Sequence, residues 1–404
     1  MRHRVIAALG AGALVGAQPP AAAPPRALAL THANVLDGVS ALPHRDVTVL
    51  VERGRIQALL PAQSRLPRGA QVVDLKGAWL LPGLIDAHVH LRDEESARRA
   101  LWAGVTTARS LGVDGFVDVG MARRHAAGDN GLPDIIGAGY HVRPRLADAF
   151  FADFPALAHL KTGLADGVAA REVVRANASR GAALIKLMAT QRAGTPDTDF
   201  RLRALSDDQL AAAAAEARRL RLPVAAHAHT DEGVRAAVLA GARTIEHGTA
   251  ASPATLRLMR ARRACLVPTL SFWADMAAAG GEYDHPLLAA RAREMLPAAR
   301  RTIDQARRAR VTIIAGSDMR YDSTSLLGIA DELLLMRDSG LDAHQVLRGA
   351  TSAAAACLGV GHRTGSVRPG LEADLLVVGA DPRSDLSVLK RPTMVINDGA
   401  IVPR

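Results

Sequence analysis

The chain has 404 residues, of which 49% are hydrophobic and 22% are charged, a balance typical of a globular protein with a large core. The formal net charge is +10, but the arginines are scattered and aromatic residues make up only 3% of the chain. This composition excludes the interleaved basic and aromatic pattern of a nucleic-acid-binding surface, so we expect no nucleic acid partner.

The amino-terminal residues combine a short basic start with an apolar run from Val5 to Ala17, which is too short to span a bilayer. Small residues follow, and they offer cleavage sites after Ala17 or Ala23. The pattern predicts a secretory signal peptide and leader over residues 1–23. No later segment is apolar for long enough to form a membrane span. We therefore expect an exported protein, periplasmic or secreted.

The two cysteines, Cys265 and Cys357, are too few for a disulfide scaffold or a metal–thiolate site. We interpret each as a small buried apolar residue. The sequence leaves a bridge between them open.

Short β-rich segments occur near both ends of the chain, at 24–82 and 367–404, and predict one small β-sandwich domain assembled from the two ends. Between them, residues 83–366 alternate strand-like and helix-like segments. This alternation predicts a (β/α)8 barrel of the TIM type. The eight expected strands are Leu84–His90, Val105–Arg109, Asp134–Ala138, Ala182–Met188, Val224–His227, Thr244–His247, Cys265–Leu270 and Val311–Gly316.

Potential metal ligands lie at the carboxyl ends of these strands, where barrel enzymes carry their active sites. His88 and His90 are two residues apart, so both side chains face the same side of a strand. His227 and His229 repeat this spacing, and His247 and Asp318 end two later strands. Each signal is weak alone, but together they indicate a metal centre.

Lys186 stands inside an apolar strand, in a chain where almost all other basic residues are arginine. A buried lysine is costly unless it is paired or uncharged. Lysine can lose its proton and form covalent adducts, which arginine cannot do. We therefore expect Lys186 to react with carbon dioxide, giving a carbamate that bridges two cations.

The segment Leu81–His90 resembles the opening motif of the amidohydrolase superfamily. The resemblance continues through later motifs in the same order and covers nearly the whole mature chain. These motifs are Gly104–Thr107, Ile185–Thr190, Ala226–His229, Ile245–Gly248, Gly316–Asp318, Gly365–Gly370 and Ala373–Leu375. The chain is most similar to the imidazolonepropionase-like branch, which includes exported Xaa-Pro or Xaa-basic dipeptidases and ochratoxin-type amidases.

The resemblance implies two divalent metal ions and assigns their ligands. His88 and His90 bind the first metal, His227 and His247 bind the second, and the Lys186 carbamate bridges them. Asp318 touches the first metal and acts as the base. Imidazole, carboxylate and carbamate ligands suit zinc. His229 lies further out and is expected to touch substrate.

The loops that would line the substrate pocket depart from the family pattern at Ala108–Gly112, Gly137–Pro144 and Thr190–Gly194. A dipeptide or N-acyl amino acid presents a free carboxylate, and a buried carboxylate needs cationic or multiple donors. The loops offer such groups, and we expect substrate contacts from among them. The candidates are Tyr140, His141, Arg143, Arg145 and Arg192.

We therefore predict a hydrolase that cleaves an amide bond of a small molecule or dipeptide by metal-activated hydroxide. A hydrolase of a cyclic amide or ester is the enzymatic alternative. A catalytically silent barrel used as a binding module is disfavoured, because none of the six ligand positions is missing. The sequence leaves a homo-oligomer open.

Overall fold

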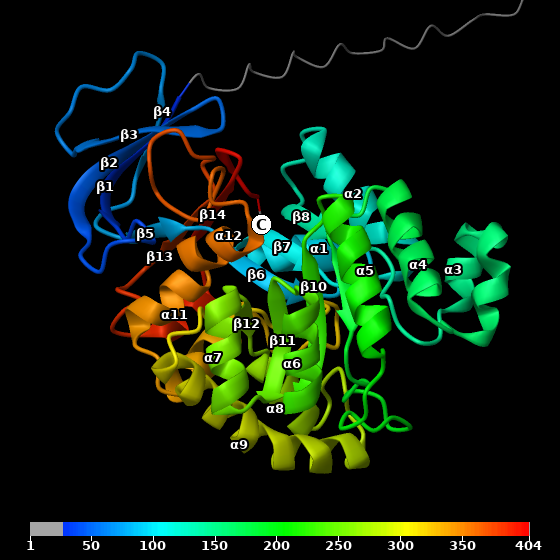
Figure 1. Ribbon diagram of the computed structural model, residues 1–404. Helices are drawn as coiled ribbons and strands as arrows, with labels where there is room; N and C mark the ends of the chain where they lie inside the picture. Colours follow the sequence, from blue (N-terminus) through cyan, green and yellow to red (C-terminus); the bar gives the residue numbers. More distant parts are fainter. Residues whose placement is uncertain (1–26, 404) are drawn as a thin grey trace, which may run out of the picture.

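The computed structural model describes residues 27–403, so the expected signal peptide and leader lie outside the described residues. The first and last strands of this range build one β domain (Figure 1). Its eight strands share a single hydrogen-bonded set in the order β15-β14-β13-β5-β1-β2-β3, with β4 branching from β1. Their bounds are β1 Leu28–Val35, β2 His44–Glu52, β3 Arg55–Pro61, β4 Gln71–Asp74, β5 Trp79–Pro82, β13 Leu375–Val378, β14 Met394–Asn397 and β15 Ala400–Ile401.

Pairing between β5 and β13 joins the two ends of the chain, since Leu81 lies opposite Leu376 in the antiparallel register. The inward side chains of this domain form a hydrophobic core of their own. The amino-terminal part of the domain runs directly into the barrel, because β6 begins at Leu84, one residue after Gly83.

The barrel strands are parallel and form two arcs, β6-β7-β8 and β9-β10-β11-β12. Their bounds are β6 Leu84–Val89, β7 Val105–Ser110, β8 Asp134–Gly137, β9 Ile185–Met188, β10 Val224–Thr230, β11 Thr244–Ala250 and β12 Cys265–Val267. Isolated parallel bridges link the arcs: Val142 pairs with Leu187, Leu266 with Ile313, and Val89 with Met319. The eighth expected strand therefore lies between β12 and β6 and closes the (β/α)8 barrel through these bridges.

Helices cover the outside of the barrel (Figure 1). Their bounds are α1 Glu94–Trp102, α2 Val117–Ala126, α3 Asp148–Asp153, α4 Gly167–Ser179, α5 Asp207–Arg219, α6 Asp231–Ala240, α7 Pro253–Arg262, α8 Leu270–Ala277, α9 Pro286–Arg308, α10 Ile329–Asp338, α11 Ala343–Gly349 and α12 Ser352–Leu358. The start of α5 shows why a helix begins there: Ser206 caps the amide of Gln209, whose side chain reaches back to the Ser206 amide. Within residues 27–403, no helix is long and apolar enough to cross a bilayer.

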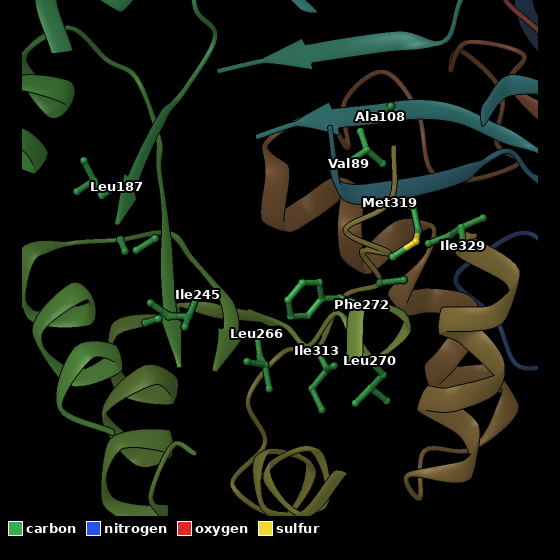
Figure 2. Packing of buried hydrophobic residues seen from close by; sticks show 14 of the residues in the cluster. Val89, Ala108, Leu187, Ile245, Leu266, Leu270, Phe272, Ile313, Met319 and Ile329 are labelled. Atoms are coloured by element: carbon green, nitrogen blue, oxygen red, sulfur yellow. The ribbon is translucent and has the colours of Figure 1, made fainter. Parts of the chain in front are cut away.

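The main hydrophobic core fills the barrel and the layer between strands and helices. Figure 2 shows part of it, with Leu266 of β12 beside Ile313 of the closing segment, as their parallel bridge requires. A packed interior of this kind fixes the strand ends rigidly, and the site is built on those ends.

The two cysteines are not separate buried residues, because Cys265 and Cys357 form a disulfide. The bond joins the start of β12 to α12 across 92 residues of sequence. Sequence spacing gave no signal for this contact, since it depends on how α12 packs against the barrel.

Candidate active site

His88 and His90 converge on the carboxylate of Asp318. The Nε2 atoms of the two rings lie 3.3 and 3.0 Å from Asp318 Oδ1. The opposite ring nitrogens are engaged, since His88 Nδ1 lies 2.9 Å from Glu246 Oε2 and His90 Nδ1 lies 3.0 Å from the Gly112 carbonyl. Carboxylate and carbonyl oxygens only accept, so each Nδ1 carries the proton and each Nε2 has its lone pair free for a ligand.

Glu246 is held in place by a buried network that the sequence did not reveal. Arg109 Nη2 donates to Glu246 Oε1 at 2.9 Å, and the Thr244 hydroxyl donates to the same oxygen at 2.5 Å. Arg109 also donates from Nε to the Ala87 carbonyl at 2.7 Å. The network therefore runs from β7 through β11 to His88 on β6 and orients the imidazole. The signal that the sequence offered was the presence of two charged residues, Arg109 and Glu246, inside strands.

A second group of donors comes from β10 and β11. Ligand nitrogens of His227, His229 and His247 all lie within 4.8 Å of one another, and those of His88, His247 and the Asp318 carboxylate form a second such group. His247 belongs to both groups. Its Nε2 lies 2.9 Å from His227 Nδ1, and its Nδ1 lies 2.7 Å from the Thr269 hydroxyl. Both His247 and Asp318 have positive φ angles, 70° and 60°, which is the sort of backbone strain found at functional sites.

Lys186 lines the same pocket as these groups. It is 1% exposed, and among the described residues its Nζ has no hydrogen-bond partner. Burial lowers the pKa of Lys186 to about 8, so part of the population carries a neutral amine near neutral pH. A buried lysine without a partner is energetically costly, and its position in a pocket with imidazoles and a carboxylate explains why the chain tolerates it.

The donor set fits divalent metal ions. Burial lowers the pKa values of His88, His227 and His247 well below the ordinary value, so the rings are neutral, as metal ligands must be. The cluster offers several imidazole nitrogens, a carboxylate and a lysine with a free amine, and imidazole with oxygen donors suits zinc. These are the six ligand positions expected from the sequence, and the structure brings all six together in one pocket.

A wider pocket of about 410 Å³ adjoins this centre. Its lining is strongly basic, with Arg92, Arg143, Arg192 and Arg320 against one carboxylate, Asp114. The two pockets are continuous, because four residues line both. They are His90, His141, Arg192 and Tyr283.

The structure brings some of the expected substrate residues to this pocket and not others. His141 and Arg143 line it. Tyr140 does not line either pocket: its hydroxyl donates to Asp153 at 2.6 Å and accepts from the Gly115 amide at 2.9 Å. His229 is fully buried beside His227 and His247, and Arg145 does not line the pockets.

Two pocket arginines, Arg92 and Arg320, were not predicted from the sequence. Arg92 stands two residues after His90, and in extended chain this spacing puts side chains on the same side, which was a signal for Arg92. The same spacing from Asp318 to Arg320 gave no such signal, because Asp318 has a φ of 60° and the chain is not extended there. Tyr283, which follows α8, had no comparable signal.

Gly112 sets the distance between His90 and His141. Its φ is +113°, and a Cβ at this position would lie 2.2 Å from Cε1 of His141. Only glycine allows the His141 ring to pack there while the Gly112 carbonyl holds His90.

Residues 79–402 match the Amidohydrolase family, and the chain belongs to this family. Together with the barrel and its strand-end side chains, the match identifies a hydrolase that acts on amide C–N bonds.

Three similar proteins show the range of relatives. An uncharacterized protein of Mycobacterium tuberculosis (strain ATCC 25618 / H37Rv) is 33% identical over 349 residues, covering 82% of this chain and 87% of its own. Ochratoxinase of Aspergillus niger is 29% identical over 236 residues, covering 57% of this chain and 48% of its own. The crystal structure of a prolidase complexed with N-methylphosphonate-L-proline is 26% identical with a TM-score of 0.80, covering 94% of this chain and all of that one (100%).

Proposed function

We propose that the protein is a binuclear, zinc-dependent hydrolase of the amide bond in a dipeptide or N-acyl amino acid. One observation carries this proposal: the side chain of Lys186, which has no partner among the described residues, lines one pocket with four histidines and a carboxylate, and this pocket adjoins a basic one. These residues are His88, His90, His227, His247 and Asp318. The prolidase complexed with N-methylphosphonate-L-proline supports an amide substrate that carries an amino acid.

The residues of the inner pocket would have separate roles in metal binding and proton transfer. His88 and His90 would hold one ion, His227 and His247 the other, and the neutral Lys186 amine would add carbon dioxide to give a bridging carbamate. When bound, the ions would lower the pKa of a water and polarise the scissile carbonyl. Asp318 accepts the proton of the attacking water at its carboxylate and returns it to the leaving nitrogen.

The outer pocket would orient the substrate. A carboxylate on the amine side of the scissile bond would meet Arg143 and Arg192, whose planar guanidinium groups match a carboxylate with two parallel hydrogen bonds. His141 lies where the two pockets join and is placed to contact the group that bridges them. His229 would orient the His247 ring, on which its own ring stacks with centroids 4.5 Å apart.

A comparison of acids with amides tests this function. Zinc-loaded protein should hydrolyse dipeptides and N-acyl amino acids, and conversion of the substrate carboxylate to its amide should lower kcat/KM by about 10-fold or more. Equal rates for acid and amide would show that the enzyme does not recognise the carboxylate, and would favour a cyclic amide or ester as the substrate. No hydrolysis of any of these compounds would overturn the proposal.

We also propose that the protein is exported. Disulfides form and persist in oxidising compartments such as the periplasm and the extracellular space, and Cys265 and Cys357 are bonded. The basic and apolar amino-terminal pattern agrees with this destination. Detection of the protein in a periplasmic or culture fraction tests the proposal, and its retention in the cytosol with reduced cysteines would contradict it.

A further inference from the structure

The outer pocket carries more positive charge than one carboxylate needs. Four arginines line it, and Asp114 is the one acidic residue in its lining. Of the four, Arg320 has an acidic neighbour, since its Nε lies 3.6 Å from Glu282 Oε2. Asp114 shares no ion pair within 4.0 Å with any described arginine of this pocket. Most of the pocket's positive charge is therefore not neutralised by the protein.

Arg143 and Arg192 are the clearest case. Neither guanidinium forms an ion pair with any carboxylate among residues 27–403. They lie close enough for their charges to repel: burial and then the like charge of Arg192 lower the pKa of Arg143, and the Asp114 carboxylate partly offsets this lowering. Arg143 is half-buried and Arg192 is exposed, so water solvates part of the charge, and an anionic ligand would neutralise more of it.

We propose that this pocket selects substrates whose leaving amine is an acidic amino acid, so that the amine half presents two carboxylates. The inference rests on the proposed amide hydrolysis. One carboxylate, the α-carboxylate, pairs with one guanidinium. The side-chain carboxylate of a glutamate or aspartate then pairs with the other, which a neutral side chain would leave beside a like charge.

The position of the pocket supports this assignment. Arg192 lines both the metal pocket and the outer pocket, whereas Arg143 lines the outer pocket alone. An amino acid whose nitrogen is at the metal centre would therefore reach Arg192 first and Arg143 further out. A basic leaving residue would add positive charge to the same space, so Xaa-basic dipeptides are disfavoured for this chain.

Binding of single amino acids tests the charge preference without requiring turnover. Calorimetry on zinc-loaded protein with L-glutamate, L-glutamine and L-lysine compares ligands that share the α-amino and α-carboxylate groups. L-Glutamate should bind about 10-fold more tightly than L-glutamine, as expected for one further hydrogen-bonded charge pair. L-Lysine should bind more weakly than either.

Substitutions separate the roles of the two arginines. Arg143→Gln should remove most of the glutamate preference, whereas Arg192→Gln should weaken L-glutamate and L-glutamine alike by removing the partner of their shared α-carboxylate. Arg143→Lys should retain part of the preference because the charge persists without the planar fork. Arg301→Gln is the matched control, because Arg301 is exposed on α9 and lines neither pocket. Circular dichroism would establish that each variant is folded.

The outcomes separate this inference from the proposed function. Equal affinity of the wild type for L-glutamate and L-glutamine would overturn the inference. Loss of L-glutamine binding in both Arg143→Gln and Arg192→Gln would also overturn it, because it would show that both arginines bind the same α-carboxylate. Hydrolysis of Ala-Gln as fast as Ala-Glu would also overturn it while leaving amide hydrolysis intact. If the protein prefers L-glutamate but hydrolyses neither dipeptide, the inferred selectivity of the pocket is supported and the proposed function is contradicted.

Discussion

Glu246 Oε2 lies 2.9 Å from Nδ1 of His88, so a residue that lines neither pocket fixes which nitrogen of a proposed metal ligand faces the site. The carboxylate is fully buried and is also paired with Arg109 at 2.9 Å. A chain of this kind, from a charged residue through a carboxylate to an imidazole, raises the basicity of the ligand and restricts its rotation.

Glu246→Gln should therefore weaken metal binding by about 10- to 100-fold, because the amide cannot support the same ring orientation and charge. Chelator competition measures the affinity directly. Glu294→Gln is the control, since Glu294 is exposed and pairs with Arg201 on the surface. Wild-type metal affinity in folded Glu246→Gln would show that the contact does not orient His88.

Lys186 gives a second test. Lys186→Ala should lose most activity, and a short carboxylic acid in the buffer should restore part of it by supplying the missing bridging oxygens. Lys186→Arg should stay inactive, because a guanidinium does not deprotonate and cannot form a carbamate. Rate measurements with and without added acid check both statements, and full activity of Lys186→Arg would exclude the bridging role.

The disulfide between Cys265 and Cys357 closes a long loop, with 92 residues of separation. Replacing both cysteines with alanine should lower the free energy of unfolding by about 2–4 kcal/mol, because the reduced chain gains entropy when unfolded. Denaturant titration measures the loss. Thiol assay of unfolded, unreduced wild type should find no free thiol, and the finding of two would contradict the bond.

Glu216 predicts how stability varies at acid pH. Hydrogen bonds from Arg219 and then Arg175 lower the pKa of Glu216 to about 2, which ties α5 to α4. Because the folded pKa is below the unfolded value of about 4.3, the stabilisation is present above that value and is lost as pH falls toward 2.

Glu216→Gln should accordingly lower the free energy of unfolding by about 1 kcal/mol near neutral pH, a modest value because both arginines are largely exposed. The difference from wild type should shrink toward zero at about pH 2. Denaturant curves at the two pH values give the comparison. An equal difference at both would show that packing, and not charge, accounts for the effect.

Much of the site follows from the sequence because parallel barrel strands place their carboxyl ends on one rim. His88, His247 and Asp318 could thus be assigned to one centre although they are far apart in the chain. The eighth strand was expected as a full strand, but it pairs through isolated bridges at Ile313 and Met319.

The side on which loop residues point could not be assigned before the strand pairing was known. Val142 pairs with Leu187, which makes residues 140–143 strand-like. Side chains in such a segment alternate, so His141 and Arg143 face the pocket while Tyr140 packs with Phe116 and Phe150. The role of Glu246 was not predicted for a different reason. Its partners, His88 and Arg109, come from other strands, and only the closed barrel brings them within hydrogen-bond distance.

The most direct test is the metal content of the purified enzyme measured together with its amidase activity. The account predicts about two divalent ions per chain in active protein, zinc being the expected metal. His88→Ala and His247→Ala should each lower this number and the activity together. Elemental analysis that finds no bound metal in wild-type protein, while it still hydrolyses a dipeptide or N-acyl amino acid, would contradict the account.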